Sequence, residues 1–303
     1  YAPAAAVCSL PLHVVAAGFL FWLSARAPGG VTAAALFLAA SLAFYRIGWL
    51  MHDALHGGVF GDPRFDRPFG DLCAAVLGES PSGWRYQHRA HHVAPNVRGV
   101  DGDQSERWDE HRRFRSLVVA APNLLLLARY RGVYLPKTLL LLGLRDLFLC
   151  HRHARRNFPR ELALALCSAV VQLGWLCWLF GGLGAPLFFL HTMIGMVYLN
   201  TVFMGSHYDL PVRTPAEAAV LDFVTLQVTA TRNYRTSALT RFFCGGVEHQ
   251  IEHHLFPTLS RRGLRRAGPL VRAFCEERGL PYNELPFVRS VVAALRYHVD
   301  PRA

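Results

Sequence analysis

Charged residues are scarce in this chain of 303 residues: they make up 17% of it, against about 25% in an average soluble domain. Hydrophobic residues account for 52%. A disordered chain has the opposite balance, with little hydrophobicity and much charge, so the composition excludes disorder. Because the few charges leave long apolar runs between them, the composition also argues against an ordinary water-soluble globule.

Paired cysteine motifs are missing as well. The seven cysteines are odd in number and scattered, and none of them forms a C-x-x-C pair. This pattern indicates free thiols in a reducing environment and assigns the cysteines no chemistry.

Long uncharged runs suggest membrane spans. A turn signal, Gly181 to Pro186, divides the longest run, residues 162–208, into two lengths of about 20 residues, and a helix needs about 20 apolar residues to cross a bilayer. Ala27-Pro28-Gly29-Gly30 closes a first hairpin and this turn a second. The sequence therefore predicts four spans, near residues 8–25, 31–49, 162–180 and 186–205.

Two alternatives concern these apolar segments. Ala25-Arg26-Ala27 resembles a cleavage site, so the first span could be a signal peptide, but a second span follows at once and no basic segment precedes it. Residues 116–128 are uncharged but too short to span easily, so we expect an interfacial helix there. A further hairpin through 116–144 would return the chain to the same face.

Basic residues predict the orientation. Of the 32 Lys and Arg residues, 31 lie in 46–161 or 205–303, on one side of a four-span arrangement. The positive-inside rule makes that side cytoplasmic. This asymmetry explains the formal charge of +11, and with no compact basic patch interleaved with aromatics we expect no nucleic acid partner.

The 15 histidines are the most informative feature. Three short motifs place histidines, and in the third a glutamine and two histidines, three or four positions apart, which puts these side chains on one face of a helix. A single His-x-x-x-His pair is common on ordinary surface helices, but three such motifs on one side of the membrane favour a metal site. His13 and His191 lie inside predicted spans and are interpreted as packed polar residues. The motifs are His52-Asp53-Ala54-Leu55-His56, His88-Arg89-Ala90-His91-His92 and Gln250-Ile251-Glu252-His253-His254.

These motifs resemble the three histidine boxes of membrane fatty acid desaturases. The third, which continues as Leu255-Phe256-Pro257, resembles the subgroup of acyl desaturases whose third box opens with glutamine, including the front-end enzymes. The similarity runs from about Arg46 to the C-terminus. It implies an all-α membrane protein with four transmembrane helices in two hairpins, forming one domain over 1–303. A cytosolic helical cap, from 50–161 and 206–303, would hold a histidine-rich dimetal site.

The resemblance implies a non-haem di-iron centre that uses O2 and two electrons to desaturate an acyl chain. From the residues alone, iron, zinc or copper would suit the imidazoles, but only a redox metal can activate oxygen. Gln250 stands where many relatives have a histidine, and His249 remains possible by helical spacing. Phe203 stands where some relatives have an asparagine that contacts the metal through water. The implied ligands are His52, His56, His88, His91, His92, His207, Gln250, His253 and His254.

Other residues in and near the boxes could support the site without binding metal. Asp53 and Glu252, inside the boxes, could orient ligand imidazoles through hydrogen bonds or could be solvated acids. Asn233 resembles a polar position before the third box in relatives. We also expect an apolar tunnel for the acyl chain, lined by Trp49, Phe60 and Trp84, although ordinary packing explains each aromatic singly.

Two functions remain open for such a site. The first is a fatty acyl desaturase acting on a lipid-, CoA- or carrier-linked chain, and the alternative is a membrane di-iron hydroxylase or monooxygenase acting on an alkyl, sterol or carotenoid substrate. A metal transporter is disfavoured, because transporters place their ligands at mid-membrane.

Partners and location follow from the same reasoning. The sequence shows no His-Pro-Gly-Gly motif of a cytochrome b5 module, so we expect a separate electron donor, a ferredoxin or a cytochrome b5 with its reductase, unless a segment before Tyr1 carries such a module. Arg261, Arg262, Arg265 and Arg266 form a basic cluster that the positive-inside excess already explains, although it could meet an acidic donor, lipid headgroups or carrier phosphates. A bacterial inner membrane and an endoplasmic reticulum both fit a multi-pass protein with its histidine boxes on the cytoplasmic side.

Overall fold

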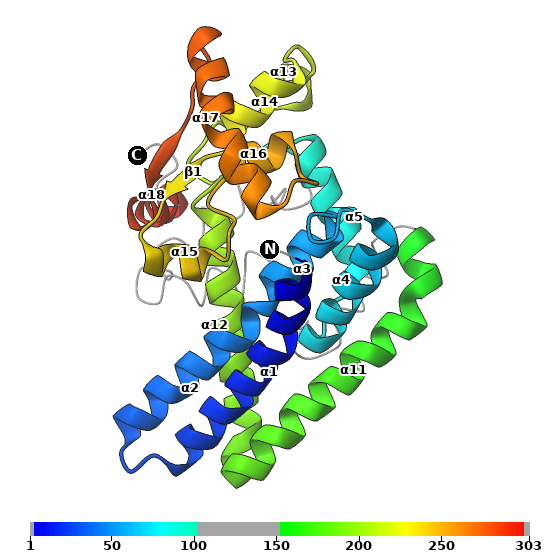
Figure 1. Cartoon of the computed structure of the whole chain (residues 1–303), viewed down its shortest axis with the longest axis vertical. Coiled ribbons are helices and arrows are strands. Elements are labelled where there is room, and N and C mark those ends of the chain that lie inside the picture. Colours follow the sequence, from blue (N-terminus) through cyan, green and yellow to red (C-terminus); the bar gives the residue numbers. More distant parts are fainter. Residues whose placement is uncertain (1–2, 102–151, 300–303) are drawn as a thin grey trace.

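Helices dominate the computed structural model, which describes residues 3–101 and 152–299 (Figure 1). The interfacial helix expected at 116–128 and the alternative hairpin through 116–144 lie outside the described residues. The first described part contains α1 (Pro3–Arg26), α2 (Gly30–Tyr45), α3 (Ile47–Leu55), α4 (Pro63–Leu77) and α5 (Pro81–Val93). The second contains α11 (Arg152–Phe180), the 3-10 turn η2 (Gly181–Leu183), α12 (Gly184–Met204), α13 (Pro215–Ala219), α14 (Phe223–Ala230), β1 (Asn233–Arg235), α15 (Ala238–Cys244), α16 (Gln250–Leu255), α17 (Arg261–Glu277), β2 (Glu284–Pro286) and α18 (Phe287–Val299).

Three helical stretches among the described residues are long and apolar enough to cross a membrane: Pro3–Arg26, Gly30–Leu55 and Pro159–Met204. The last comprises most of α11 and all of α12, joined by η2. The helices begin earlier or run further than the spans expected from the sequence. α1 starts at Pro3, and α11 reaches back to Arg152, before the uncharged run begins.

The long helices form the lower half of the molecule in Figure 1, and the short elements gather at the upper end. α1 and α2 lie side by side and connect at the lower end, as do α11 and α12. α12 packs against α2 and so joins the two pairs. The segments that carry the histidine motifs therefore share one end of the molecule.

The first histidine motif lies on a direct extension of α2. α2 ends at Tyr45 and α3 begins at Ile47, while Arg46 between them keeps helical angles of φ −60° and ψ −20°. The chain therefore continues nearly straight from an apolar helix into the helix that carries His52.

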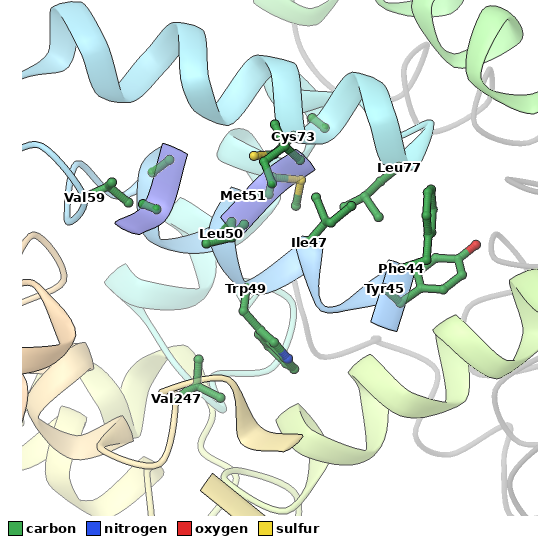
Figure 2. Close-up of a cluster of buried hydrophobic side chains, with 14 of the residues drawn as sticks. Phe44, Tyr45, Ile47, Trp49, Leu50, Met51, Val59, Cys73, Leu77 and Val247 are labelled. Carbon is green, nitrogen blue, oxygen red and sulfur yellow. The ribbon is translucent and has the colours of Figure 1, made fainter. Parts of the chain in front are cut away.

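A buried hydrophobic cluster holds α3 in place (Figure 2). Ile47, Trp49 and Leu50 are each at most 1% exposed. The indole N–H of Trp49 donates to the Tyr198 hydroxyl at 2.8 Å, which satisfies the one polar group of this side chain. Gly245 packs so closely on Trp49 that a Cβ at this position would collide with the indole ring. The core therefore joins α3, α12 and the segment before the third motif.

Local capping positions α5, which carries the second motif. Ser80 caps the helix by accepting from the Gly83 N–H at 3.0 Å, and Pro81 stands at its first turn. The buried carboxylate of Glu161, from α11, accepts hydrogen bonds from the hydroxyls of Ser80 at 2.5 Å and Ser82 at 2.7 Å. α11 thus fixes the start of α5.

A small parallel sheet departs from the expected all-α fold. β1 pairs with β2, with Asn233 opposite Glu284 and Arg235 opposite Pro286. Strands of three residues carry no recognisable alternation, and their pairing is not local, so sequence periodicity could not predict them.

Candidate metal centre

Three helices and one loop bring the predicted histidines together. His52 lies on α3 and His56 caps its end, α5 carries the second motif, and α16 carries His253 and His254. His207 follows the end of α12. All these imidazoles are buried except that of His56, which is half-buried.

The first group contains His52, His56, His88 and His253. One ring nitrogen from each of the four lies within 4.8 Å of the others, a spacing that could hold a metal ion. The ring of His253 lies 4.7 Å from those of His52 and His56, centre to centre. The third motif is therefore beside the first, about 200 positions away in the sequence.

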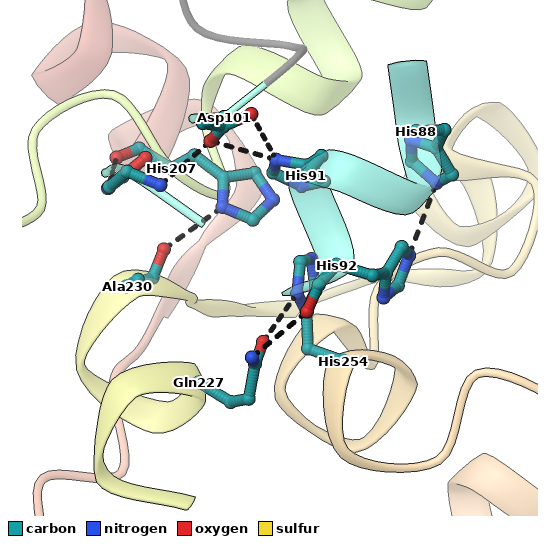
Figure 3. A network of polar contacts seen from close by, with 9 residues as sticks. His88, His91, His92, Asp101, His207, Gln227, Ala230 and His254 are labelled. Carbon is teal, nitrogen blue, oxygen red and sulfur yellow. Dashed lines mark hydrogen bonds and ion pairs between the residues drawn. The ribbon is translucent and has the colours of Figure 1, made fainter. Parts of the chain in front are cut away.

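The second group contains His91, His207 and His254, again with one nitrogen from each within 4.8 Å of the others. The ring of His91 lies 4.6 Å from that of His207 and 4.8 Å from that of His254 (Figure 3). His207, a lone histidine in the sequence, thus joins the second and third motifs.

His92 lies between the two groups. Its ring stacks on that of His254 at 4.3 Å and lies 4.6 Å from that of His56. Its Nε2 is 3.2 Å from Nε2 of His88. The imidazoles therefore form one continuous cluster in which the two groups are neighbours.

Acceptor oxygens hold Nδ1 of several of these imidazoles. His254 Nδ1–H donates to Gln227 Oε1 at 3.0 Å, and His207 Nδ1–H donates to the Ala230 carbonyl at 3.0 Å. His91 Nδ1–H donates to the Asp101 carboxylate at 3.0 Å. A proton held on Nδ1 leaves the lone pair on Nε2, so these contacts orient the rings as metal ligands require.

Several buried polar atoms, in the cluster and on Gln250, lack a hydrogen-bond partner among the described residues. Nε2 of His52, Nε2 of His253 and both amide atoms of Gln250 have no hydrogen-bond partner among residues 3–101 and 152–299. Buried polar groups are normally satisfied, because an unmade hydrogen bond costs about 1–3 kcal/mol. Orphaned nitrogens that converge in this way fit a site built for metal.

The electrostatic environment favours the neutral form of three imidazoles in the cluster. Burial lowers the pKa of His92, His253 and His254 well below the usual range for histidine, and the neighbouring imidazoles lower it further. Neutral imidazole is the form that binds metal, so these residues need lose no proton near pH 7.

His249 and Gln250, although adjacent, differ in burial and surroundings. The Gln250 side chain is 1% exposed, whereas that of His249 is 25% exposed and lines a separate pocket with Arg46 and Arg261. His249 belongs to neither group of nitrogens. Burial thus favours Gln250 over His249, and Gln250 as a metal ligand stays a prediction.

The acids inside the boxes have different contacts. Asp53 accepts a hydrogen bond from Nδ1 of its neighbour His52 at 3.2 Å. Glu252 accepts from Asn233 Nδ2 and from the Tyr282 hydroxyl, both at 2.8 Å, while Nδ1 of His249 lies 3.8 Å away. Glu252 and Asn233 therefore fasten α16 to β1.

Aromatic rings cover the first group. Trp84 stacks on His88 at 4.3 Å, and Phe203 lies 5.9 Å from His52. Trp49 packs on Phe203, whereas Phe60 packs on aromatic rings of α4. An acyl tunnel along Trp49, Phe60 and Trp84 stays a prediction.

Two residues that orient the ligands could not be expected from the sequence. Asp101 accepts from His91 and also from the Asn96 N–H at 2.7 Å. Gln227 is fully buried and joins His254 to the backbone carbonyl of His92, to which its Nε2 donates at 3.0 Å. Neither residue lies at helical spacing from a histidine motif, so only the tertiary structure reveals them.

Comparison with known proteins identifies the family. A model of the fatty acid desaturase family matches residues 27–286, so the chain belongs to that family, and the resemblance seen in the three boxes is confirmed. The family and the long apolar helices together mark it as a membrane protein.

Named relatives are similar along most of this chain. The acyl-lipid (9-3)-desaturase of Physcomitrium patens is 29% identical over 276 residues, which cover 84% of this chain and 51% of the relative. The Delta(8)-fatty-acid desaturase of Euglena gracilis is 30% identical over 277 residues, covering 84% and 64%. Fatty acid desaturase 3 of Bos taurus is 28% identical over 318 residues, covering 94% and 65%. The matched region spans roughly half to two thirds of the length of these relatives.

Proposed function

We propose that this protein is a membrane-bound acyl desaturase that uses O2 and two electrons to introduce a C=C bond into an acyl chain. The observation that carries the proposal is the convergence of imidazoles from three distant motifs into two adjoining groups, in a chain of the desaturase family. The relatives named above are desaturases of acyl lipids and fatty acids.

The donor set suits a pair of iron ions. His52, His56, His88 and His253 would hold one ion, and the second group (His91, His207 and His254) would hold the other. His92 and Gln250 complete the ligand set from positions beside them. Such a centre, when bound, supplies the oxygen activation that removal of hydrogen from an unactivated C–H bond requires.

The protein's own residues prepare the site in two ways. Gln227, Asp101 and the Ala230 carbonyl hold protons on Nδ1 of their partner imidazoles, so the lone pairs face inward before any ion arrives. Trp84 and Phe203 cover the imidazoles with apolar surface. This surface would exclude water and present an apolar wall to an acyl chain.

The same proposal gives the orientation in the membrane. α1, α2, α11 and α12 would cross the bilayer as two hairpins, and the short elements with the histidines would form a cytoplasmic cap. The apolar lengths of these helices and the distribution of basic residues support this topology. Electrons would come from a separate donor, a ferredoxin or a cytochrome b5 with its reductase.

Fatty-acid profiling of a host with defined lipids tests the function. Cells that express the wild type should accumulate a new unsaturated acyl species, and cells that express His253→Ala at equal membrane abundance should not. The variant removes one imidazole from the first group, which the residual nitrogens cannot replace. A new hydroxylated species without an olefin would instead favour the hydroxylase, and mass spectrometry distinguishes the two products.

A further inference from the structure

A basic pocket lies near the metal centre, and His249, which precedes the third motif, is part of its lining. It has a volume of about 150 Å3, several times the ~30 Å3 that a water molecule occupies in the liquid. Four arginines and a single carboxylate line it, together with His249 and two glycines. The lining residues are Arg46, Arg241, Gly245, Gly246, Glu248, His249, Arg261 and Arg265.

Arg46 is the most constrained of these cations. Its side chain is 9% exposed, its guanidinium stacks on the Phe242 ring at 3.7 Å, and Nε donates to Nε2 of His13 at 3.1 Å. Its buried Nη1 has no hydrogen-bond acceptor among the described residues. A buried guanidinium with an unused donor, lining a pocket, indicates that an acceptor belongs there.

The two arginines of α17 come from one helical face. Arg261 and Arg265 are four positions apart and both line the pocket, whereas Arg262 and Arg266 do not. Arg261 is held in place by Asp53, which accepts from its Nε at 2.5 Å, and by the Trp49 carbonyl, which accepts from Nη2 at 3.1 Å. The basic cluster of the sequence therefore divides into a lining pair and an outer pair.

The pocket keeps a positive excess after its acids are counted. Glu248 pairs with Arg241, whose Nε lies 3.3 Å from Oε1, and Asp53 pairs with Arg261. Arg46 and Arg265 have no ion-pair partner among the described residues. Guanidinium groups match the oxygens of phosphate in geometry and charge, so two uncompensated arginines favour a phosphate ester.

In the proposed topology the pocket lies at the boundary of the bilayer. Arg46 is the first charged residue after the uncharged run 27–45 and ends α2. α15, which lies at the lower edge of the short elements in Figure 1, exposes Leu239 by 66% and Phe242 by 55% beside Arg241. Apolar side chains next to arginines at the end of a spanning helix are typical of the headgroup level.

We infer that this pocket binds the phosphate ester of an acyl carrier. A membrane phospholipid and coenzyme A both offer this group, and the position at the headgroup level favours the phospholipid. The claim that the bound phosphate belongs to the substrate rests on the proposed desaturase function. The claim that the pocket binds a phosphate ester depends only on the arginines.

Binding measurements without turnover test the site. Purified protein in a neutral detergent is titrated with short-chain phosphatidylglycerol, with coenzyme A and with phosphate-free short-chain diacylglycerol. We expect the phospholipid to bind and the diacylglycerol not to bind. Arg265→Gln should weaken binding about tenfold, since it removes a charge-assisted hydrogen bond, and Arg46→Gln should weaken it at least as much.

Arg266→Gln provides the matched control, because it makes the same change on the same helix outside the pocket lining. Arg265 is exposed, so its variant keeps the test valid should Arg46→Gln fail to fold. If only coenzyme A binds, and its binding depends on Arg46 and Arg265 in the same way, the phosphate site is supported and its ligand is coenzyme A rather than a phospholipid. Binding of neither phosphate ester, or equal binding by Arg265→Gln and Arg266→Gln, would overturn the inference.

A variant of the metal centre distinguishes failure of the phosphate site from failure of the desaturase proposal. His253→Ala should bind the phospholipid as the wild type does, because it changes only the metal centre. Phospholipid binding in a wild type that makes no olefin would contradict the desaturase but not the site. Olefin formation with no phosphate binding would contradict the site but not the desaturase.

Discussion

Arg261 donates a hydrogen bond of 2.5 Å to Asp53, although 208 positions separate them in the chain. The same carboxylate accepts from Nδ1 of His52 through its other oxygen. The Asp53 carboxylate thus joins the first histidine motif to α17, which follows the third motif. Asp53 therefore contacts both a histidine of the metal centre and an arginine of the basic pocket.

Asp53→Asn should weaken metal binding. The substitution leaves Arg261 without its charged partner and loosens the orientation of His52, a change that typically costs about 10- to 100-fold in metal affinity. Iron titration of the purified protein, followed by metal analysis, measures the effect. Asp62→Asn is the control, since it removes an exposed ion pair with Arg64 while asparagine still caps α4. Equal losses in both variants would contradict a role for Asp53 in holding His52.

Gln227→Leu should lower both stability and metal affinity. Leucine has a similar volume but cannot accept from His254 or donate to the His92 carbonyl, so we expect a loss of about 1–3 kcal/mol in the free energy of unfolding. Metal affinity should fall about tenfold, because His254 loses its orienting acceptor. Gln172→Leu, which removes the hydrogen bonds from Nε2 to Ser168 Oγ and to the Val76 carbonyl, should leave metal affinity unchanged.

Two adjacent substitutions decide which residue of the third motif binds metal. Gln250→Ala should reduce the iron bound per chain, whereas His249→Ala should not, because His249 lines the basic pocket. Metal analysis of both variants, purified in parallel, gives the result. Loss of iron in His249→Ala alone would reverse the assignment.

Gly245→Ala should be more destabilising than Gly279→Ala. Both glycines have a φ of +63°, so alanine pays the same backbone cost of about 1–2 kcal/mol at each position. Only at Gly245 would the added Cβ collide with Trp49, while Gly279 has open space around it. Overpacking should add about 1–3 kcal/mol at Gly245, measurable as a larger decrease in Tm. Similar decreases for the two variants would show that the close contact with Trp49 is unimportant.

Local spacing explains how much of the site could be expected from the sequence. His88, His91 and His92 share a face of α5 because helical geometry fixes neighbours three and four positions apart. The same rule left His249 open, since it lies four positions before His253. In the structure α16 begins only at Gln250, so His249 stands at the N-cap position, and the helical spacing from His253 does not apply to it.

Contacts between distant segments could not be expected in this way. Asp101 and Gln227 reach their imidazoles through loops and a neighbouring helix, and β1 meets β2 across about 50 positions. The packing of α17 also decides that Arg261 and Arg265, out of the four clustered arginines, line the pocket. The sequence therefore predicted the histidine motifs and the long helices, while the orienting residues required the structure.

The nearly unbroken helix of α2 and α3 has a mechanical consequence. Residues 30–55 form a rod of about 39 Å at 1.5 Å per residue, and in the proposed topology its lower part lies in lipid and His52 lies near its upper end. Spanning helices tilt when the surrounding bilayer becomes thinner or thicker. Such a tilt would move His52 and His56 relative to the imidazoles on α5 and α16, so the thickness of the membrane would bear directly on the geometry of the metal centre.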